Sequence, residues 1–460
     1  MKRTIHSLVI LCLIIFSLAG CSKSQDSNDS TTYIKLNLLS NGPEITKDGT
    51  YVISGELFDE KIDVEAQGEV RLILSGVTIQ NDDDEAIKTE PGSHTIIEIA
   101  ENTENTLISS GDATINAKGS IEICGTGKLY IDNKTKHGIE SDGDIIIESG
   151  NIDISSYEHG IKSEMKINVL GGNINIQTQT GKGIKAEKEY IGEGGNVTIY
   201  SVQDEGLESK GALTINDGIY EITSCDDAIN AGTSDSVSEK SNTKEIMPPP
   251  PEHIDNTPIE DGDIITIPEG ATTSGRGIPF EHERQHGGFG KANADSVITI
   301  NGGTIKINTS GDGIDSNGSL TIKGGTVIID GPKKYDNGSL DSDGEMIIEN
   351  ATVICASSNG MTQYPMSMTQ KSIIIDFDTG LKKDTVIVIK DSEQNILVEH
   401  TVGVICERFY FTSPEVKDDV NYTVYINGAE HSTAVAEIPK GGFGYMRKPA
   451  GKREDFIPKY

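Results

Sequence analysis

The 460-residue chain is poor in the residue types that most often mark a site. It contains no tryptophan, six cysteines and nine histidines. No Cys-x-x-Cys spacing occurs, so the common cysteine-type zinc site is excluded, and so few cysteines do not form a disulfide scaffold. A phosphate-binding loop and a nucleophile elbow are also missing. Without tryptophan, a flat aromatic contact surface would have to be built from tyrosine.

Positive charge is scarce as well. The sequence has 39 Lys and Arg against 72 Asp and Glu, which gives a formal net charge of −33 at pH 7. Such an acidic surface repels phosphate backbones and anionic lipids, so we expect no nucleic-acid partner and no binding to an anionic lipid surface. Unaided binding of acidic polymers is disfavoured for the same reason.

Long apolar runs are limited to one, Leu8 to Leu18, which is too short to span a bilayer. Lys2 and Arg3 precede it, as in a secretory signal peptide. The run ends in Leu-Ala-Gly-Cys at Cys21, which is similar to the bacterial lipobox, where the peptidase cuts before a cysteine that becomes lipidated. We therefore expect Cys21 to be lipidated and the chain to be extracytoplasmic, lipid-anchored to the cell membrane. A plain signal peptide with an incidental Cys21 is the alternative.

What the chain has in abundance is repetition. Seven five-residue segments share one pattern, in which an apolar residue follows a small residue and precedes a polar one. The apolar residue recurs at steps of 22, 23, 23 and 22, then after 85 and after 26. A weaker copy surrounds Ile87, and Ile115 lies 24 residues before the first of the seven. A fixed period of this size is the signature of a repeat architecture. The seven apolar residues are Ile139, Ile161, Ile184, Leu207, Ile229, Ile314 and Leu340.

Each repeat contains two further apolar pairs with period-two alternation, such as Ile145 and Ile147, then Ile152 and Ile154, with Gly150 between them. Alternation of this kind predicts strands with one buried face. Three short strands that recur in register predict coils stacked about 4.8 Å apart around inward columns of Ile and Val. The predicted fold is all-β: a right-handed parallel β-helix of about 22–23 residues per coil with a small C-terminal β domain. An antiparallel sandwich or propeller is the alternative, but the spacing is too short for a propeller blade.

The repeat pattern also divides the chain. A run of four prolines from Pro248 to Pro251 lies in the interval where the repeats stop, which indicates a loop extruded between adjacent coils. Looser strand patterns before the regular repeats indicate a cap, which a solenoid needs to close its open core. We expect a lipoprotein signal peptide at 1–20, a tether at 21–32, an N-terminal cap and first coils at 33–112, coils at 113–231, an inserted flexible loop at 232–294, coils at 295–370, a C-terminal β segment at 371–439 and a basic tail at 440–460.

One edge of the predicted helix concentrates carboxylates, because stacking aligns the residues that flank each repeated apolar position. Two like charges about 4.8 Å apart repel by about 3.5 kcal/mol at an effective dielectric of 20. A stack of them must be protonated, paired with lysine or neutralised by a cation. Oxygen-rich clusters without histidine suit Ca²⁺, so we expect a structural calcium; a solvated acidic edge and a catalytic metal are the alternatives. The predicted ligands are Asp204, Glu205, Asp226, Asp227, Asp312 and Asp315.

Two histidines occupy the same column. His137 and His159 are predicted to stack one coil apart, next to Lys182. Polar turn positions are the simpler interpretation and a base cluster is the alternative. We assign no catalytic residue.

At these residues the chain resembles a bacterial family of calcium-containing parallel β-helix carbohydrate-binding proteins. The family pattern is Asp-Asp-Gly/Ala-Ile, followed by an alternating strand, Gly-Gly and Thr/Asn-Val/Ile-x-Ile. The resemblance covers roughly residues 45–428 and implies polysaccharide binding, calcium at the Asp-rich turns and a fold similar to pectate lyases without assigned catalysis. His137 and His159 depart from the pattern because they replace acids. The matching stretches are residues 226–231, 298–305, 311–316, 320–327, 412–414 and 422–425.

We therefore expect a monomeric, surface-anchored carbohydrate-binding protein with calcium as its cofactor and a polysaccharide as its partner. Uronate polymers fit better than flat cellulose faces, because the outward columns are not aromatic. The enzymatic alternative is a calcium-dependent polysaccharide lyase, which needs a Lys or Arg base and could use Lys182, Lys185 or Lys210. A surface adhesin or structural stalk is the third possibility.

Overall fold

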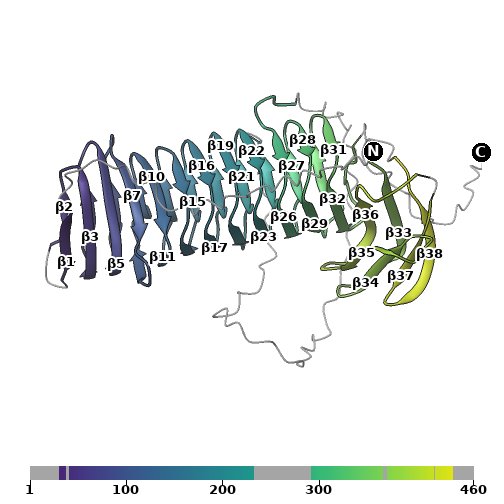
Figure 1. Cartoon of the computed structure of the whole chain (residues 1–460), viewed down its shortest axis with the longest axis horizontal. Helices are drawn as coiled ribbons and strands as arrows, with labels where there is room; N and C mark the ends of the chain where they lie inside the picture. Colours follow the sequence, from purple (N-terminus) through teal and green to yellow (C-terminus); the bar gives the residue numbers. More distant parts are fainter. Residues whose placement is uncertain (1–30, 38–40, 233–291, 366–369, 419, 439–460) are drawn as a thin grey trace, which may run out of the picture.

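The computed structural model describes residues 31–37, 41–232, 292–365, 370–418 and 420–438. Within these ranges the secondary structure consists of strands, without an α-helix, so none of the described segments is a helix that could cross a membrane. The predicted signal peptide, Cys21, the tether up to residue 30, residues 233–291 of the predicted loop and the predicted tail all lie outside the described residues. Figure 1 shows a long stack of coils that ends at a small sheet.

Three strands per coil form three faces of a parallel β-helix, which confirms the predicted fold class. The first, face one, is a sheet of 11 parallel strands. Its members are β2 (Glu44–Ile45), β4 (Ile62–Val64), β6 (Ile87–Thr89), β9 (Ala113–Ala117), β12 (His137–Ser141), β15 (Ile161–Ser163), β18 (Ile184–Ala186), β21 (Leu207–Ser209), β24 (Ile229–Ala231), β27 (Ile314–Ser316) and β30 (Leu340–Ser342).

Faces two and three belong to one continuous 23-stranded sheet, because the long strands of the first coils run across both. These long strands are β3 (Gly49–Phe58) and β5 (Glu69–Asn81), with β1 (Thr32–Leu36) paired to the first part of β3. Face two continues as β7 (His94–Ile99), β10 (Ser120–Gly125), β13 (Ile145–Ile147), β16 (Lys166–Val169), β19 (Glu189–Gly192), β22 (Ala212–Ile215), β25 (Ile298–Ile300), β28 (Leu320–Ile322) and β31 (Met346–Ile348). Face three continues as β8 (Glu104–Ser109), β11 (Lys128–Asn133), β14 (Asn151–Ser156), β17 (Asn173–Thr178), β20 (Asn196–Ser201), β23 (Ile219–Ser224), β26 (Thr304–Thr309), β29 (Thr326–Asp330) and β32 (Thr352–Ser357).

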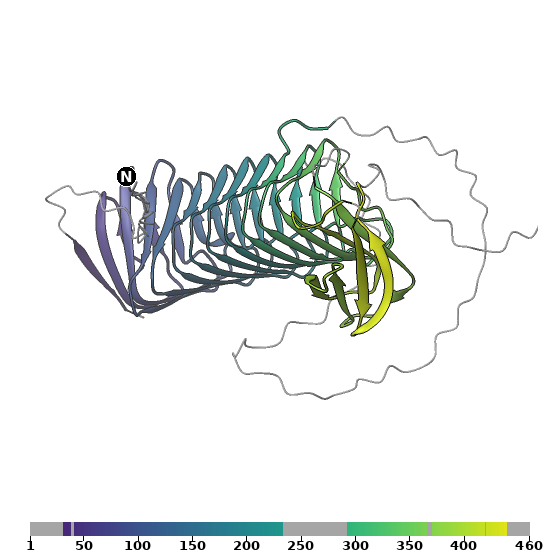
Figure 2. The same cartoon turned by 45° about the vertical axis from the view of Figure 1, so that its right-hand side comes forward.

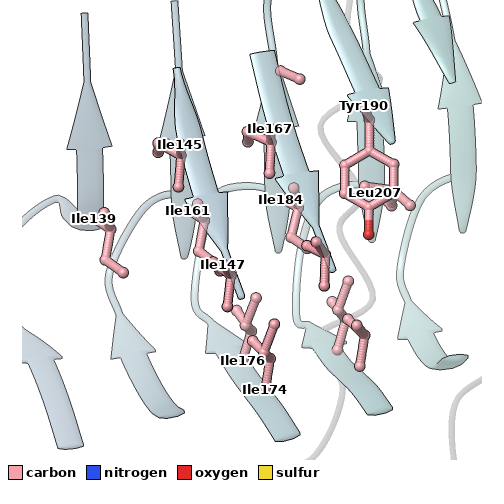
Figure 3. Packing of buried hydrophobic residues seen from close by; sticks show 14 of the residues in the cluster. Ile139, Ile145, Ile147, Ile161, Ile167, Ile174, Ile176, Ile184, Tyr190 and Leu207 are labelled. Carbon is pink, nitrogen blue, oxygen red and sulfur yellow. The ribbon is translucent and has the colours of Figure 1, made fainter. Parts of the chain in front are cut away.

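The core is a set of inward columns, one residue per coil. On face one, Ile139, Ile161 and Ile184 pair in register and are fully buried. Figure 3 shows the side chains of these three residues following one another along the inside of the stack. The column continues without a break from Ile229 to Ile314, which are direct partners in neighbouring coils although 85 residues separate them in sequence. The predicted register across the interruption is therefore confirmed.

Glycine recurs between faces two and three because each corner brings two backbones close together. Gly172 has a φ of +93°, and a Cβ there would lie 2.9 Å from the carbonyl oxygen of Gly150 one coil earlier. A side chain at this corner would be strained twice, by the left-handed backbone and by the contact. The same slot is filled by glycine in coil after coil, which keeps the stacking distance constant.

The C-terminal segment closes the last coil and adds a second core. Strand β36 (Cys406–Thr412) pairs antiparallel with β32 on face three, and β33 (Ser372–Leu381) pairs with β36. Beside them stands a four-stranded antiparallel sheet, visible at the end of the stack in Figure 2. Its strands are β34 (Val386–Lys390), β35 (Ile396–Thr401), β37 (Asn421–Ile426) and β38 (Ala429–Val435). Outward residues of β32, such as Ile354, are thereby buried against this sheet.

Candidate functional site

The six predicted metal ligands lie on adjacent coils: five lie in the turns that lead into face one, and Asp315 lies within strand β27. They form two groups of three, and within each group one carboxylate oxygen per residue lies within 4.8 Å of the others. We call Asp204, Glu205 and Asp226 the first carboxylate group, and Asp227, Asp312 and Asp315 the second. The sequence thus predicted which side chains meet, because the repeat fixes the stacking of the turns.

The first carboxylate group has a cation of its own. Lys182, one coil earlier, places its Nζ 2.5 Å from Glu205, 3.2 Å from Glu208 and 3.7 Å from Asp204. Burial opposes the ionisation of both Asp204 and Glu205, but the hydrogen bond with Asp204 and the nearby ammonium lower the pKa of Glu205, whereas the pKa of Asp204 is raised. Sequence spacing did not reveal this pairing or the role of Glu208, which is only 1% exposed. Lysine therefore already balances much of the negative charge in this group.

The second carboxylate group lacks such a partner. Among the described residues, no lysine or arginine forms an ion pair with Asp227, Asp312 or Asp315. Hydrogen bonds reach it only from neutral donors: the backbone N–H of Asp312 donates to Asp227 Oδ1 at 2.7 Å, and Asn230 Nδ2 donates to Asp227 Oδ2 at 3.2 Å. The backbone N–H of Gly338 donates to Asp312 Oδ1. These contacts leave the negative charge of three stacked carboxylates uncompensated.

Burial and the uncompensated charge raise the pKa values of the carboxylates in the second group. Burial, reinforced by the neighbouring carboxylates, raises the pKa of Asp312 to about 8 and that of Asp315 to about 7. The pKa of Asp227 is raised well above its usual value for the same reasons. Without a cation, the group is therefore partly protonated at neutral pH.

A further oxygen lies beside the second carboxylate group, on Asn230. Asn230 sits between Glu208 and Asp315 in the pairing of face one, and its amide already donates to Asp227. Its Oδ1 is buried and accepts no hydrogen bond from any described residue. Three carboxylates and one amide oxygen are ligands of the kind that hard cations such as Ca²⁺ prefer. The residues present therefore fit calcium at the second carboxylate group.

The two histidines form a ladder in which each side chain supports the next coil. Their rings stack with centroids 4.9 Å apart and an interplanar angle of 11°, as the sequence predicted. His137 Nδ1 accepts the backbone N–H of His159 at 3.3 Å, and His159 Nδ1 accepts that of Lys182 at 2.9 Å. Asp227 and Asp312 accept the N–H of the following coil in the same way. The histidines are thus neutral acceptors that replace aspartate in this structural task.

Burial, followed by the nearby positive groups, lowers the pKa of His159 to about 2, and burial lowers that of His137 as well. Both rings are therefore uncharged at physiological pH, which agrees with their role as acceptors. A base cluster is not what the contacts describe, since the Nδ1 atoms are engaged with the backbone.

The three lysines considered as catalytic bases are all held in ion pairs. Lys185 Nζ lies 2.6 Å from Glu187, and Lys210 Nζ lies 2.9 Å from the same side chain. Burial lowers the pKa of Lys182, but Glu205, Glu208 and Asp204 outweigh it and raise the pKa above the usual value. A lysine that keeps its proton this firmly is poorly suited to act as a general base.

The sequence of this chain matches a known protein family. A family described as "Carbohydrate-binding domain-containing protein" matches residues 41–338, a span that includes both carboxylate groups. A protein of the same description from Acetivibrio thermocellus is 29% identical over 127 residues, which are 25% of this chain and 44% of that protein. The chain therefore spans less than half the length of this relative.

Among solved structures, the chain is similar to a gadolinium derivative of a polysaccharide lyase-like protein from C. thermocellum. The match covers 72% of this chain and 96% of that one, at 19% identity and a TM-score of 0.30. A similarity with so low a TM-score does not establish the fold, which follows from the strand pairing. The family match, in contrast, extends over more than half of the sequence. The chain belongs to the family of carbohydrate-binding domain-containing proteins.

Proposed function

We propose that this protein binds an acidic, uronate-type polysaccharide outside the cytoplasm, where Cys21 anchors it, and that calcium at the second carboxylate group makes the binding possible. Family membership supports the carbohydrate ligand. The single observation that carries the calcium proposal is the partly buried cluster of Asp227, Asp312 and Asp315, which no lysine or arginine of the described residues neutralises.

Calcium would be held by these three carboxylates and by the orphaned Oδ1 of Asn230. When bound, it supplies positive charge that removes the mutual repulsion of the carboxylates and can accept a carboxylate of the ligand as an additional oxygen donor. The first carboxylate group is the weaker candidate, because Lys182 already lies among its oxygens. Of the six ligands predicted from the sequence, Asp227, Asp312 and Asp315 would therefore hold the calcium.

The charge of the whole chain explains why a cation is needed for this ligand. With a net charge of −33, the protein repels a polyuronate over several ångströms. A bound calcium adds two positive charges at the edge where face one begins and so lowers the negative potential there. We therefore expect binding that depends on calcium and weakens at high ionic strength.

We propose a binding protein rather than a lyase, because Lys182, Lys185 and Lys210 are all engaged with carboxylates. A lyase needs an unprotonated base next to the metal-bound sugar. Incubation with polygalacturonate tests this point directly: we expect no increase in the absorbance of unsaturated uronate products. A calcium-dependent increase would establish the lyase instead.

The central experiment measures retention of the protein on immobilised polygalacturonate with millimolar calcium and with chelator. The double variant Asp227→Asn/Asp312→Asn keeps the acceptor oxygens that the following coil needs but removes two charges. Asp112→Asn, in the turn before β9 and 65% exposed, is the matched control. We expect chelator and the double variant to abolish retention and the control to retain it. Retention that ignores chelator and the double variant alike would exclude the calcium-dependent mechanism.

A further inference from the structure

A cavity of about 360 Å³ lies where face three meets the four-stranded C-terminal sheet. It contains none of the six carboxylates discussed above. One wall is the outer surface of β23, β26 and β29, and the other includes His400 of β35. Its polar lining comes from Glu221, Thr223, Lys306, Asn308, Asp330 and His400.

The cavity is the end of a longer row of polar side chains. One outward residue per coil on face three forms this row, which we call the face-three row, and the coil-to-coil register places its members directly next to one another. Neighbours interact along the row: Asn175 donates to Asp153 at 2.7 Å, and Lys306 Nζ lies 2.8 Å from Glu221. The members are Tyr130, Asp153, Asn175, Thr198, Glu221 and Lys306.

The row is open along its length and closed at one end. Glu221 and Lys306 are 52% and 53% exposed, whereas Ile328 in the next coil is partly buried. One coil further, Ile354 is only 6% exposed because the C-terminal sheet covers it. A linear polymer that lies along the face-three row must therefore stop at the cavity. Coil spacing of about 4.8 Å is comparable with the length of one sugar, so successive sugars can meet successive side chains.

The far wall of the cavity is held in place by a buried pair. His400 is 7% exposed, and its Nε2 lies 3.0 Å from Asp330 Oδ1, which also accepts the backbone N–H of Gly403 at 2.9 Å. The ring packs against Phe409, with centroids 6.0 Å apart. The polar groups of both signs, together with the apolar side of Ile328, offer donors, acceptors and an apolar contact within one small volume. Sugar hydroxyls and a pyranose C–H face match such a lining.

We propose that this cavity binds the terminal sugar of the polysaccharide, while the following sugars lie along the face-three row. This proposal rests on the proposed function, since it takes for granted that the protein binds a glycan. It adds a place for the ligand and a preference for chain ends, neither of which follows from the calcium site. His400 lies outside the stretch that matches the family, so the closed end is a feature of this chain beyond the matched residues.

The test uses the protein with calcium and polygalacturonate hydrolysed to fragments of different mean length. At equal mass, shorter fragments carry more ends, so we expect the amount of protein bound per mass to rise in proportion to the number of ends. Two variants probe the cavity: Glu221→Ala/Lys306→Ala removes the ion pair at its entrance, and Asn308→Trp fills it. We expect each to weaken binding at least tenfold with an unchanged melting temperature, because the substituted side chains point outward.

The control is Glu104→Ala/Lys128→Ala, which removes another exposed cross-coil pair on face three, with a 3.1 Å contact, at the opposite end. We expect its affinity to stay within twofold of wild type. The cavity is excluded if wild type binds polygalacturonate and both cavity variants bind equally well, or if capacity per mass does not depend on fragment length. Failure of wild-type protein to bind at all would overturn the proposed function, and the cavity proposal with it.

Discussion

At the residue scale, the side chain two positions before a face-one isoleucine connects its coil to the next at His137, His159, Asp227 and Asp312. Histidine and aspartate both accept a backbone N–H there, so they can replace one another in the ladder while changing its charge. Sequence spacing predicted the column and the stacking of the two histidines. It did not predict that Lys182 reaches the carboxylates of the following coil, because the direction of a long side chain does not follow from a period.

The histidine ladder predicts a loss of stability on acidification. His159 gains its proton near pH 6.5 in the unfolded chain but only near pH 2 in the folded protein. Its contribution is therefore complete above pH 6.5 and is lost as the pH falls below that value, by up to about 1.4 kcal/mol per pH unit. Replacing His159 by Asn keeps an acceptor that does not titrate. In urea unfolding at pH 7 and pH 5, we expect this variant to lose less stability than wild type, whereas His94→Asn, outside the ladder, should behave like wild type.

A second residue-scale feature is a glycine in the core whose missing side chain leaves space for two tyrosines. The inward position of face two holds Val169 and Ile215 in flanking coils but Gly192 between them. The hydroxyls of Tyr190 and Tyr220 lie 3.1 Å apart in the space that glycine leaves. The missing apolar residue in the repeat and the two nearby tyrosines are the sequence signal for this arrangement.

Gly192→Ala should destabilise the protein by about 1–3 kcal/mol, because a Cβ would lie 1.9 Å from the Tyr220 hydroxyl oxygen. Tyr220→Phe removes that oxygen, so in its background the same substitution should cost clearly less. Denaturant unfolding of the four proteins in this cycle provides the measurement. Equal costs in both backgrounds would mean that the hydroxyl is not the obstacle.

At the scale of elements, each strand is stabilised mainly by the equivalent strand one coil away. This is why the repeat period was sufficient to predict the fold and the pairing of Ile229 with Ile314. The C-terminal strands do not repeat, so nothing in their spacing indicated that β36 would pair antiparallel with β32 and cover Ile354. The cavity beside His400 was missed for the same reason.

Ile184→Asp tests the inward column of face one. The carboxylate would be buried among isoleucines without a partner, which should cost about 4 kcal/mol or more. The neighbouring outward residue supplies the control, since Lys185→Gln on the same strand changes only an ion pair with Glu187. We expect the aspartate variant to be unfolded or greatly destabilised in circular dichroism melts, and the control to lose clearly less, because Glu187 keeps its ion pair with Lys210.

At the scale of the whole molecule, charge and calcium are linked. The second carboxylate group adds repulsion to a chain of net charge −33, and under the calcium proposal a cation that binds the folded form relieves it. Calcium should therefore raise the melting temperature by mass action, with about 2.7 kcal/mol of stabilisation at a concentration 100 times the dissociation constant. Asp227→Asn/Asp312→Asn should remove this response and Asp112→Asn should keep it. A melt of wild type that is the same with millimolar calcium and with chelator would contradict the calcium proposal.

The lipid anchor is a separate prediction, made from residues outside the described part of the structure. Cys21→Ser should prevent lipidation, so the variant is released from membranes or stays unprocessed. Labelled palmitate incorporated by wild type and absent from the variant is the expected result. Equal incorporation in both would show that another residue carries the lipid.

The pairing of β24 with β27 joins two stretches of chain that are separated by the interruption in the repeats, so the protein can be cut into two halves at this point. Asp227 lies before the junction, whereas Asp312 and Asp315 lie after it, so each side of the second carboxylate group comes from a different stretch of chain. A protein cleaved anywhere between residues 233 and 291 would consist of two fragments, each ending in an unpaired coil edge that only the other completes. Co-expressed halves should reassemble into one folded complex, and calcium should stabilise that complex because its proposed ligands come from both fragments.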